Sequence, residues 1–390
     1  MSDAVLAINA GSSSLKFALF EIAAAQLVPV ADGQFEAIVT APHFIARGPK
    51  GKVLHEQRWS HRLSDQELLT ELLGFVDRHL GGDALRAVGH RIVHGGPAFD
   101  RSVRITDDTL QAIEALAPLA PLHQPHNIAP IRAIAENRPA LLQVACFDTA
   151  FHHTMPPVAA RLALPRRFEA SGLRRYGFHG LSYEFIARRL RAAAPALVAG
   201  RVIVAHLGNG ASLCAMLDGR SIDTTMGFSA LDGLVMGTRC GTLDPGVVLY
   251  LIEQCGMAAK DVEALLYNES GLLGVSGLSN DMRTLLDSDA PAARDAVELF
   301  VYRLGREAGA LASSLGGLDA FVFTAGIGEH AAAVRAASCE RLAWLGLRLD
   351  AAANARGDAV ISAPGSPVEI RVMPTDEQAM IARHTLDLID

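Results

Sequence analysis

Three positively charged side chains stand among small or apolar residues, where they suit the binding of an anion. Lys16 ends a serine-rich stretch, Arg91 closes an apolar run, and Arg239 lies between glycines. Arginine is rarely buried without a partner, so each arginine is expected to hold a carboxylate or a phosphate group. That group belongs either to the protein or to a ligand, and for one arginine alone both origins are equally expected.

Two short turns of small residues are suited to a phosphate group. Residues 9–16 read NAGSSSLK, and residues 206–210 read HLGNG. Small residues let backbone N–H groups approach an anion closely, and the first turn adds hydroxyl groups and a lysine. Neither turn is a Walker A loop, because the GxxxxGK[ST] pattern is absent. A plain hairpin is the commoner explanation of one such turn, but two at equivalent places favour a phosphate site.

A third turn resembles a dinucleotide fingerprint. Residues 326–331 read GIGEHA between a predicted strand and a predicted helix, and Asp350 follows as a candidate ribose ligand. Only about 40 residues remain after Asp350, too few for a complete dinucleotide domain. A nicotinamide-dependent dehydrogenase is therefore disfavoured, and a turn of this kind can equally hold the adenosine side of a nucleotide.

Asp148 and His179 are further candidates for chemistry. Asp148 ends a predicted strand, the usual functional end in α/β folds, and could act as a base or orient another group. His179, in the motif YGFHG, could donate to a phosphoryl oxygen. The histidines at 123 and 126 and at 152 and 153 lack the further ligands of a recognisable metal site. We expect structural roles for them, except for His123 in its proline-bounded loop.

These residues must be positioned by two α/β halves, each of which begins with a strand, a glycine-rich turn and a second strand. The predicted strands span residues 4–8, 15–20, 34–40, 52–59, 87–93, 141–147, 201–205, 212–217, 319–324 and 368–373. The predicted helices span residues 64–80, 107–116, 127–136, 245–254, 258–266, 292–315, 331–345 and the C-terminal residues. The irregular segment 149–177 predicts a domain junction, and a ligand site is expected in the cleft between two lobes.

Composition limits the partners of the chain. It has 390 residues, a net charge of −7 and no basic block, which argues against nucleic acid or a membrane surface as partner. No signal peptide or membrane-spanning run is visible. The five cysteines lack a CxxC pair, so they are expected to be buried thiols of a cytoplasmic protein: Cys146, Cys214, Cys240, Cys255 and Cys339.

Eight motifs occur in a fixed order along nearly the whole chain. They are NAGSSSLKF at 9–17, HRIVHGG at 90–96, CFDTAFH at 146–152, RYGFHG at 175–180, HLGNGAS at 206–212, MGTR at 236–239, TAGIGE at 324–329 and PTDE at 374–377. In this order they resemble the acetate kinase family, within the superfamily of actin, hexokinase and heat-shock chaperone ATPases.

The resemblance implies a two-lobed, duplicated actin-like (ribonuclease-H-like) fold with a central cleft. Residues 1–150, completed by 376–390, would form the phosphate and acyl-acceptor lobe. Residues 151–375 would form the nucleotide lobe and the interface of a homodimer. The implied activity is reversible transfer of the ATP γ-phosphoryl group to acetate, giving acetyl phosphate and ADP. Mg²⁺ is the implied ion, with Mn²⁺ as an alternative.

The resemblance also implies residue roles. Catalysis falls to Asp148, His179 and Arg239. The acyl substrate would contact Arg91, Val93, Leu122, His123, Phe178 and Ala230. The nucleotide and its phosphates would contact Ser12, Ser14, Lys16, His206, Leu207, Gly208, Asn209, Gly210, Asp281, Met282, Arg283, Gly326, Ile327, Gly328, Glu329 and His330. Asn9 and Glu377 would hold the metal ion.

The chain departs from the family at several positions. Ala230 stands in the implied wall near the substrate methyl group where relatives usually carry proline. Thr242, Gln378 and His330 also replace commoner residues, but none of them removes a catalytic group. Because one methylene changes binding by only about 1–3 kcal/mol, a propionate kinase is the near alternative. An actin- or chaperone-like ATP switch is the remote one, since a switch needs no clamp for an acyl acceptor.

Overall fold

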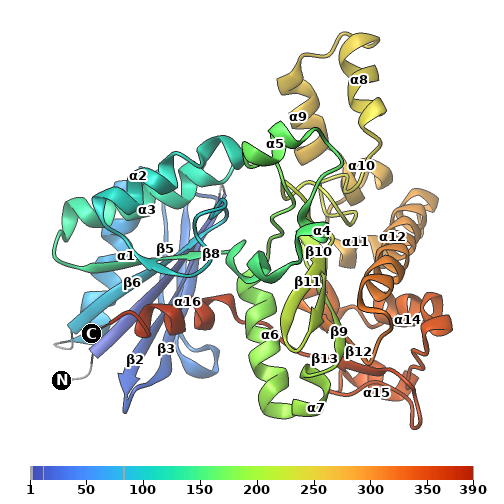
Figure 1. Ribbon diagram of the computed structural model, residues 1–390. Coiled ribbons are helices and arrows are strands. Elements are labelled where there is room, and N and C mark those ends of the chain that lie inside the picture. The colour runs from blue at the N-terminus through green and yellow to red at the C-terminus, as the bar shows by residue number, and fades with distance from the viewer. Residues whose placement is uncertain (1–2, 12, 82–83, 390) are drawn as a thin grey trace. The chain divides into compact units, whose positions relative to one another are not determined.

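The computed structural model describes residues 3–11, 13–81 and 84–389. The chain divides into two units, one formed by residues 1–150 with 376–390 and one formed by residues 151–375. The C-terminal helix α16 (Glu377–Leu386) belongs to the first unit, where it packs against the strands β1 (Asp3–Ala10) and β6 (Ala84–Ile92) (Figure 1). The chain therefore returns to its first unit only after Thr375.

The first unit is built on a mixed sheet with the strand order β5-β4-β3-β2-β1-β6-β8-β7. Its remaining strands are β2 (Leu15–Ala23), β3 (Gln26–Glu36), β4 (His43–Arg47), β5 (Val53–Arg58), β7 (Val103–Arg104) and β8 (Leu142–Phe147). Strands β1 to β5 pair antiparallel in sequence, whereas β1, β6 and β8 run parallel. Parallel strands end at the same edge, so the residues that follow β6 and β8 come close together.

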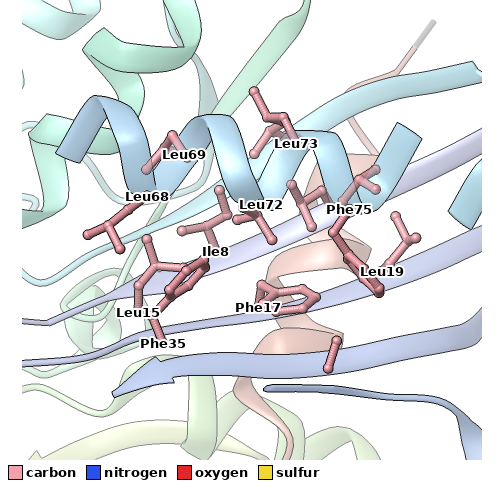
Figure 2. Packing of buried hydrophobic residues seen from close by; sticks show 14 of the residues in the cluster. Ile8, Leu15, Phe17, Leu19, Phe35, Leu68, Leu69, Leu72, Leu73 and Phe75 are labelled. Atoms are coloured by element: carbon pink, nitrogen blue, oxygen red, sulfur yellow. The ribbon is translucent and has the colours of Figure 1, made fainter. Parts of the chain in front are cut away.

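Helix α1 (Asp65–Leu80) covers one face of this sheet because its apolar residues recur at helical spacing. Figure 2 shows Leu68, Leu69, Leu72, Leu73 and Phe75 of α1 above side chains of β1, β2 and β3. The helix begins with the predicted capping box between Ser64 and Glu67 and ends at the left-handed Gly81. Helices α2 (Asp107–Glu114) and α3 (Gln124–Asn137) complete the unit.

The second unit repeats the central topology of the first. Its sheet has the order β11-β10-β9-β12-β13, with bounds β9 (Arg201–Leu207), β10 (Ala211–Leu217), β11 (Arg220–Thr224), β12 (Ala320–Thr324) and β13 (Glu369–Val372). As for β3-β2-β1-β6-β8, two antiparallel pairings are followed by two parallel ones. The structure thus contains the duplicated core that the resemblance implied.

The second unit also contains twelve α-helices within its described residues. They are α4 (Pro157–Ala160), α5 (Arg166–Ala170), α6 (Gly180–Ala193), α7 (Pro195–Val198), α8 (Pro245–Glu253), α9 (Ala259–Asn268), α10 (Gly271–Ser276), α11 (Met282–Leu286), α12 (Pro291–Leu315), α13 (Ala325–His330), α14 (Ala332–Arg341) and α15 (Ala351–Arg356). Figure 1 shows α8 and α9 extending away from the sheet of their unit. No helix among the described residues is long and apolar enough to cross a membrane.

Several predicted elements were wrong in extent. The strand expected at 34–40 is β3, which begins at Gln26 and ends at Glu36, because Ala37 has a left-handed backbone. The helix expected at 331–345 ends at Arg341, and the preceding glycine turn is itself the short helix α13. Helix α6 was not predicted, although Tyr183, Ile186, Ala187 and Leu190 repeat at helical spacing.

The expectation of five buried cysteines was also wrong. Cys146, Cys214 and Cys339 are buried, but Cys240 is half-buried and Cys255 is exposed. Cys255 follows α8, none of whose apolar side chains is buried, so an apolar sequence context did not mean burial there.

Candidate functional site

The serine-rich turn of the first unit connects β1 and β2. Asn9 and Lys16 are cross-strand partners in this hairpin, and the Gly11 amide donates to the Ser14 carbonyl at 2.8 Å. Side chains of partner residues point to the same face of a sheet, so Asn9 and Lys16 share one face. Lys16 is exposed and Ser14 is half-buried, whereas Ser12 lies outside the described residues.

Arg91, the last but one residue of β6, is the centre of an ionic cluster in the same unit. Its Nε donates to Asp148 Oδ2 at 3.0 Å, and its Nη2 donates to the same oxygen. Its Nη1 donates to Asn9 Oδ1 at 3.1 Å, and Asn9 Nδ2 donates to Glu377 Oε2 at 3.3 Å. Four predicted residues from β1, β6, α16 and the end of β8 are therefore brought together. Of the two origins open for the partner of Arg91, the internal carboxylate is present.

The electrostatics of this cluster keep Arg91 charged. Burial opposes the charged guanidinium, but the carboxylates of Asp148 and Glu377 outweigh it and raise the pKa of Arg91 above its ordinary value. Asp148 is completely buried, and its backbone amide donates to the Ile92 carbonyl at 2.9 Å. Arg91 is thus a fixed guanidinium, paired with carboxylates of the protein, at the carboxyl ends of two parallel strands, the usual place for a ligand in such sheets.

Asn127 on α3 is a supporting residue that sequence reasoning missed. Its Oδ1 accepts from the Val93 amide at 2.9 Å, and its Nδ2 donates to the Ala10 carbonyl at 2.7 Å. It therefore ties the segment after β6 to the start of the serine-rich turn. Val93 is buried. Leu122 is exposed, and His123 follows it as the residue directly before α3. No sequence pattern indicates such a long-range amide bridge.

The second phosphate-type turn connects β9 and β10, and only residues 208–210 form it. His206 and Leu207, expected in the turn, are the last residues of β9 and pair with Ser212 and Ala211. The Gly208 amide donates to the Gly210 carbonyl at 3.0 Å. The strand continues further than predicted because the hairpin register pairs these residues across to β10.

Arg239 and His179 both lie against Gly210. A Cβ atom at Gly210 would be 2.8 Å from Arg239 Nη2 and 3.2 Å from His179 Nε2. The absence of a side chain there lets both donors approach the turn. Arg239 Nη1 donates to the Ala230 carbonyl at 2.7 Å, so this arginine is held by a backbone oxygen. Three predicted motifs of the second unit therefore meet at one point.

His179 has a constrained backbone and a stacked ring. It precedes α6 with a φ of 58°, a left-handed conformation that costs energy for a residue with a side chain. Its ring stacks on that of His206 with centroids 4.1 Å apart. Phe178, the neighbouring residue, is buried, and its carbonyl accepts from His152 Nε2 at 2.9 Å. His152 is therefore structural, as expected.

The glycine turn at 325–330 is fixed by two charged residues. Glu329 Oε1 accepts from the backbone amides of Ala325 and Thr375 at 2.8 and 3.3 Å. The buried Arg335, which the sequence did not single out, donates to the carbonyls of Gly328 and Glu329 at 3.0 and 2.8 Å. Asp350 caps α15 by accepting from the amides of residues 352 and 353. Its carboxylate therefore has a structural role in this helix, which differs from the role of a ribose ligand.

The remaining predicted nucleotide residues of the second unit differ in their exposure. Asp281 caps α11 by accepting from the Arg283 amide at 2.8 Å, and the Arg283 guanidinium donates to Asp281 Oδ2 at 2.9 Å. This pair lowers the pKa of Asp281. Met282 is buried beneath them, whereas Gly326 and His330 are exposed. A groove of about 870 Å³ is lined by residues of α11, α12 and α14 and of the segment between α11 and α12.

The repeated five-stranded core, with cations and phosphate-type turns at its strand ends, defines a phosphotransferase of the duplicated actin-like class. Residues 4–383 match the Acetokinase family. An acetate kinase of Rhodopseudomonas palustris (strain TIE-1) is 55% identical over 398 residues, covering 100% of this chain and 99% of the relative. The chain therefore belongs to the acetokinase family, as its motifs indicated.

Two solved structures share this fold over their full length. A propionate kinase from Francisella tularensis has a TM-score of 0.92 and 38% identity, covering 99% of this chain and 100% of its own. The acetate kinase of Porphyromonas gingivalis has a TM-score of 0.88 and 36% identity, covering both chains completely. The predicted fold class is thereby confirmed.

Proposed function

We propose that this chain catalyses the reversible transfer of the γ-phosphoryl group of ATP to acetate, giving acetyl phosphate and ADP by direct in-line displacement. The observation that carries the proposal is the pair of fixed cations: Arg91 held by the buried Asp148, and Arg239 held against Gly210 beside His179. Phosphoryl transfer needs mainly positioning and neutralisation of charge, which such groups supply. The family membership of the chain agrees with this reaction.

In the first unit, Arg91 would bind the carboxylate of acetate, and Asp148 would hold the guanidinium in place. Acetate is already an anion at neutral pH, so the attacking oxygen carries no proton that a base must remove. We therefore propose that Asp148 orients Arg91 and does not remove a proton. Arg91 Nε and Nη2 both donate to its Oδ2 atom.

In the second unit, Arg239 and His179 would stabilise the charge that develops on the phosphoryl oxygens. Their Nη2 and Nε2 atoms lie on the same side of the β9–β10 turn. The nucleotide would extend along this turn towards Asp281 and the glycine turn at 325–330. The bonds of Glu329 and Arg335 to backbone groups fix that second turn, so its shape would be set before the nucleotide binds.

The residues of the first unit fit a Mg²⁺ ion. Glu377 offers a carboxylate and Asn9 an amide oxygen, and Mg²⁺ is usually held by one or two such oxygens together with substrate phosphates. When bound, the ion would neutralise phosphate charge; Mn²⁺ prefers similar ligands. The bond from Asn9 Nδ2 to Glu377 Oε2 keeps the two side chains adjacent, and Asn9 Oδ1 also accepts from Arg91 Nη1.

Propionate remains the alternative acyl acceptor. The similar Francisella enzyme is a propionate kinase, and Ala230 replaces the family's usual proline. In the second unit Phe178 is 2% exposed and Ala230 is 9% exposed, so both are buried and apolar. A smaller residue at 230 leaves room for one more methylene, worth about 0.8 kcal/mol. We infer that acetate is used at least as well as propionate.

Helix α8 supports the proposal of a homodimer. None of its residues is buried, although it is almost uncharged, and Leu249 and Tyr250 are 55% and 60% exposed. Contiguous exposed apolar surface of this kind marks a protein interface. Light scattering of L249D/Y250D should give the monomer mass, while the control V158D, at an exposed valine of α4, should keep the dimer mass. A monomeric parent protein would dismiss the proposal.

Trapping the product with hydroxylamine tests the function. With ATP, Mg²⁺ and acetate the protein should form acetyl hydroxamate in step with ADP, and R91A should form neither. ADP release without hydroxamate would favour an ATP switch.

An ATP-dependent enzyme is also expected in the cytoplasm. Fractionation of the source cells would test this location.

A further inference from the structure

The ring of His179 is hydrogen-bonded to one hydroxyl group, which is in turn hydrogen-bonded to a second. Neither hydroxyl has a role in the function proposed above. His179 Nδ1 lies 2.8 Å from Ser212 Oγ, and Ser212 Oγ is hydrogen-bonded to the phenol of Tyr183. Ser212 stands on β10, and Tyr183 lies one turn along α6 from His179. Both hydroxyl residues are completely buried. The three side chains therefore form a chain of hydrogen bonds shielded from water.

The chemistry of the groups sets the direction of this chain. A phenol is much more acidic than an alkyl hydroxyl, so Tyr183 is the better donor and Ser212 the better acceptor. Burial raises the pKa of Tyr183 well above its ordinary value, so the phenol keeps its proton. Among the described residues Ser212 Oγ is hydrogen-bonded to Tyr183 and His179 alone, so after accepting from Tyr183 its one proton finds an acceptor only at His179 Nδ1.

An accepting Nδ1 fixes the tautomer of the neutral ring. The single proton of the imidazole must then be on Nε2, the atom near Gly210 and Arg239 Nη2. An N–H group at that position can donate to an anionic oxygen, whereas the other tautomer would present a lone pair to it. The direction of the hydroxyl chain thus decides whether His179 can stabilise developing negative charge.

We propose that Tyr183 and Ser212 are positioning residues that hold His179 in the Nε2–H tautomer. The identity of the anion as a phosphoryl group rests on the proposed function, but the tautomer does not. His206 has a similar arrangement through Ser182 and Thr375. Both hydroxyls there are alkyl groups, so their acidity does not set a direction and the inference is confined to His179.

The tautomer is measured directly by long-range ¹H–¹⁵N correlation spectra of the protein labelled at histidine. We expect a protonated Nε2 and an unprotonated Nδ1 for His179, assigned by comparison with H179Q. His152 is an internal reference, because its Nε2 must donate to the Phe178 carbonyl while Nδ1 meets Ser221 Oγ. In S212A the His179 signals should move towards those of a ring exchanging between tautomers, with His152 unchanged. Y183F should move them less in the same direction.

Activity provides a second readout. S212A should lower kcat for acetyl phosphate formation by about tenfold or more, as for loss of an oriented donor, with KM for acetate nearly unchanged. S212T, which keeps the hydroxyl, should restore most of kcat. S338A is the matched control: Ser338 is equally buried, but it donates only to the Val334 carbonyl within α14. That variant should keep the parent kcat.

A protonated Nδ1 on His179 in the parent spectrum overturns the proposal, even if the variants fail to fold. Unchanged His179 signals in a folded S212A overturn it as well. If the spectra are as expected but the parent forms no acyl phosphate, the proposed function fails while the positioning of His179 stands.

Discussion

Three buried histidines should make the stability of this protein fall as the pH falls below neutral. Burial lowers the pKa of His90, His94 and His152 to about 4 in each case. His94 Nδ1 accepts from the Gly96 amide at 2.9 Å, so protonation would set two N–H groups against each other. The unfolded chain takes up these protons near a pKa of about 6.5. The contribution to stability is therefore full above about pH 6.5 and is lost between there and about pH 4.

The size of the loss follows from those values. Between about pH 7.5 and 5.5, each histidine with these pKa values costs about 1.3 kcal/mol of unfolding free energy. His90 and His94 belong to the first unit and His152 to the second. The first unit should thus lose about 2.6 kcal/mol, twice the loss of the second, out of a total that is typically only about 5–15 kcal/mol.

The two tryptophans allow each unit to be followed separately. Trp59 lies in the first unit and Trp344 in the second. Urea unfolding of W344F, observed through Trp59, reports the first unit, and unfolding of W59F, observed through Trp344, reports the second. Between about pH 7.5 and 5.5 the unfolding free energy should fall by more in W344F. H90L, which removes one titrating group from the first unit, should halve that fall. A fall in unfolding free energy below about 1 kcal/mol in the first unit would refute the reasoning. It would mean that these histidines take up protons in the folded unit almost as readily as in the unfolded chain.

Three further changes test single features of the site. G210A places a Cβ 2.8 Å from Arg239 Nη2 and 3.2 Å from His179 Nε2, so kcat should fall while the melting temperature, measured by calorimetry, changes little; an unchanged kcat would separate these donors from the reaction. A230P should narrow the acyl pocket and raise the ratio of kcat/KM for acetate over propionate; an unmoved ratio would remove Ala230 from the pocket. E377Q should shift the Mg²⁺ titration of activity to higher concentration, and an unshifted curve would place the ion elsewhere.

Local features of this chain could be predicted from sequence because their causes are local. The capping box at Ser64 and the hairpin turn after Asn9 depend on residues a few positions apart. The sequence alone also singled out Arg91 and Arg239, since charge in apolar surroundings is a rare pattern. It singled out Asp148 because that residue ends a predicted strand. It could not decide whether a protein group or a ligand meets each arginine.

The unpredicted features depend on contacts between distant segments. The Asn127 bridge joins α3 to the ends of two strands, and Arg335 reaches the carbonyls of α13 from the next helix. The hydroxyl groups behind His179 connect α6 with β10, through bonds between residues 29 and 33 positions apart. The exposure of α8 was hidden for a different reason: its apolar residues look like those of a core helix, and only the structure shows that none is buried.

The central claim is that a carboxylate oxygen of acetate forms the new bond to the γ-phosphorus. The most direct measurement is the ³¹P spectrum of the acyl phosphate formed from ATP and acetate labelled with ¹⁸O in both oxygens. The isotope shift of a P–¹⁸O bond in every molecule of product would agree with attack by the carboxylate that Arg91 holds. Acyl phosphate without this shift, or ADP formed with no acyl phosphate, would contradict it.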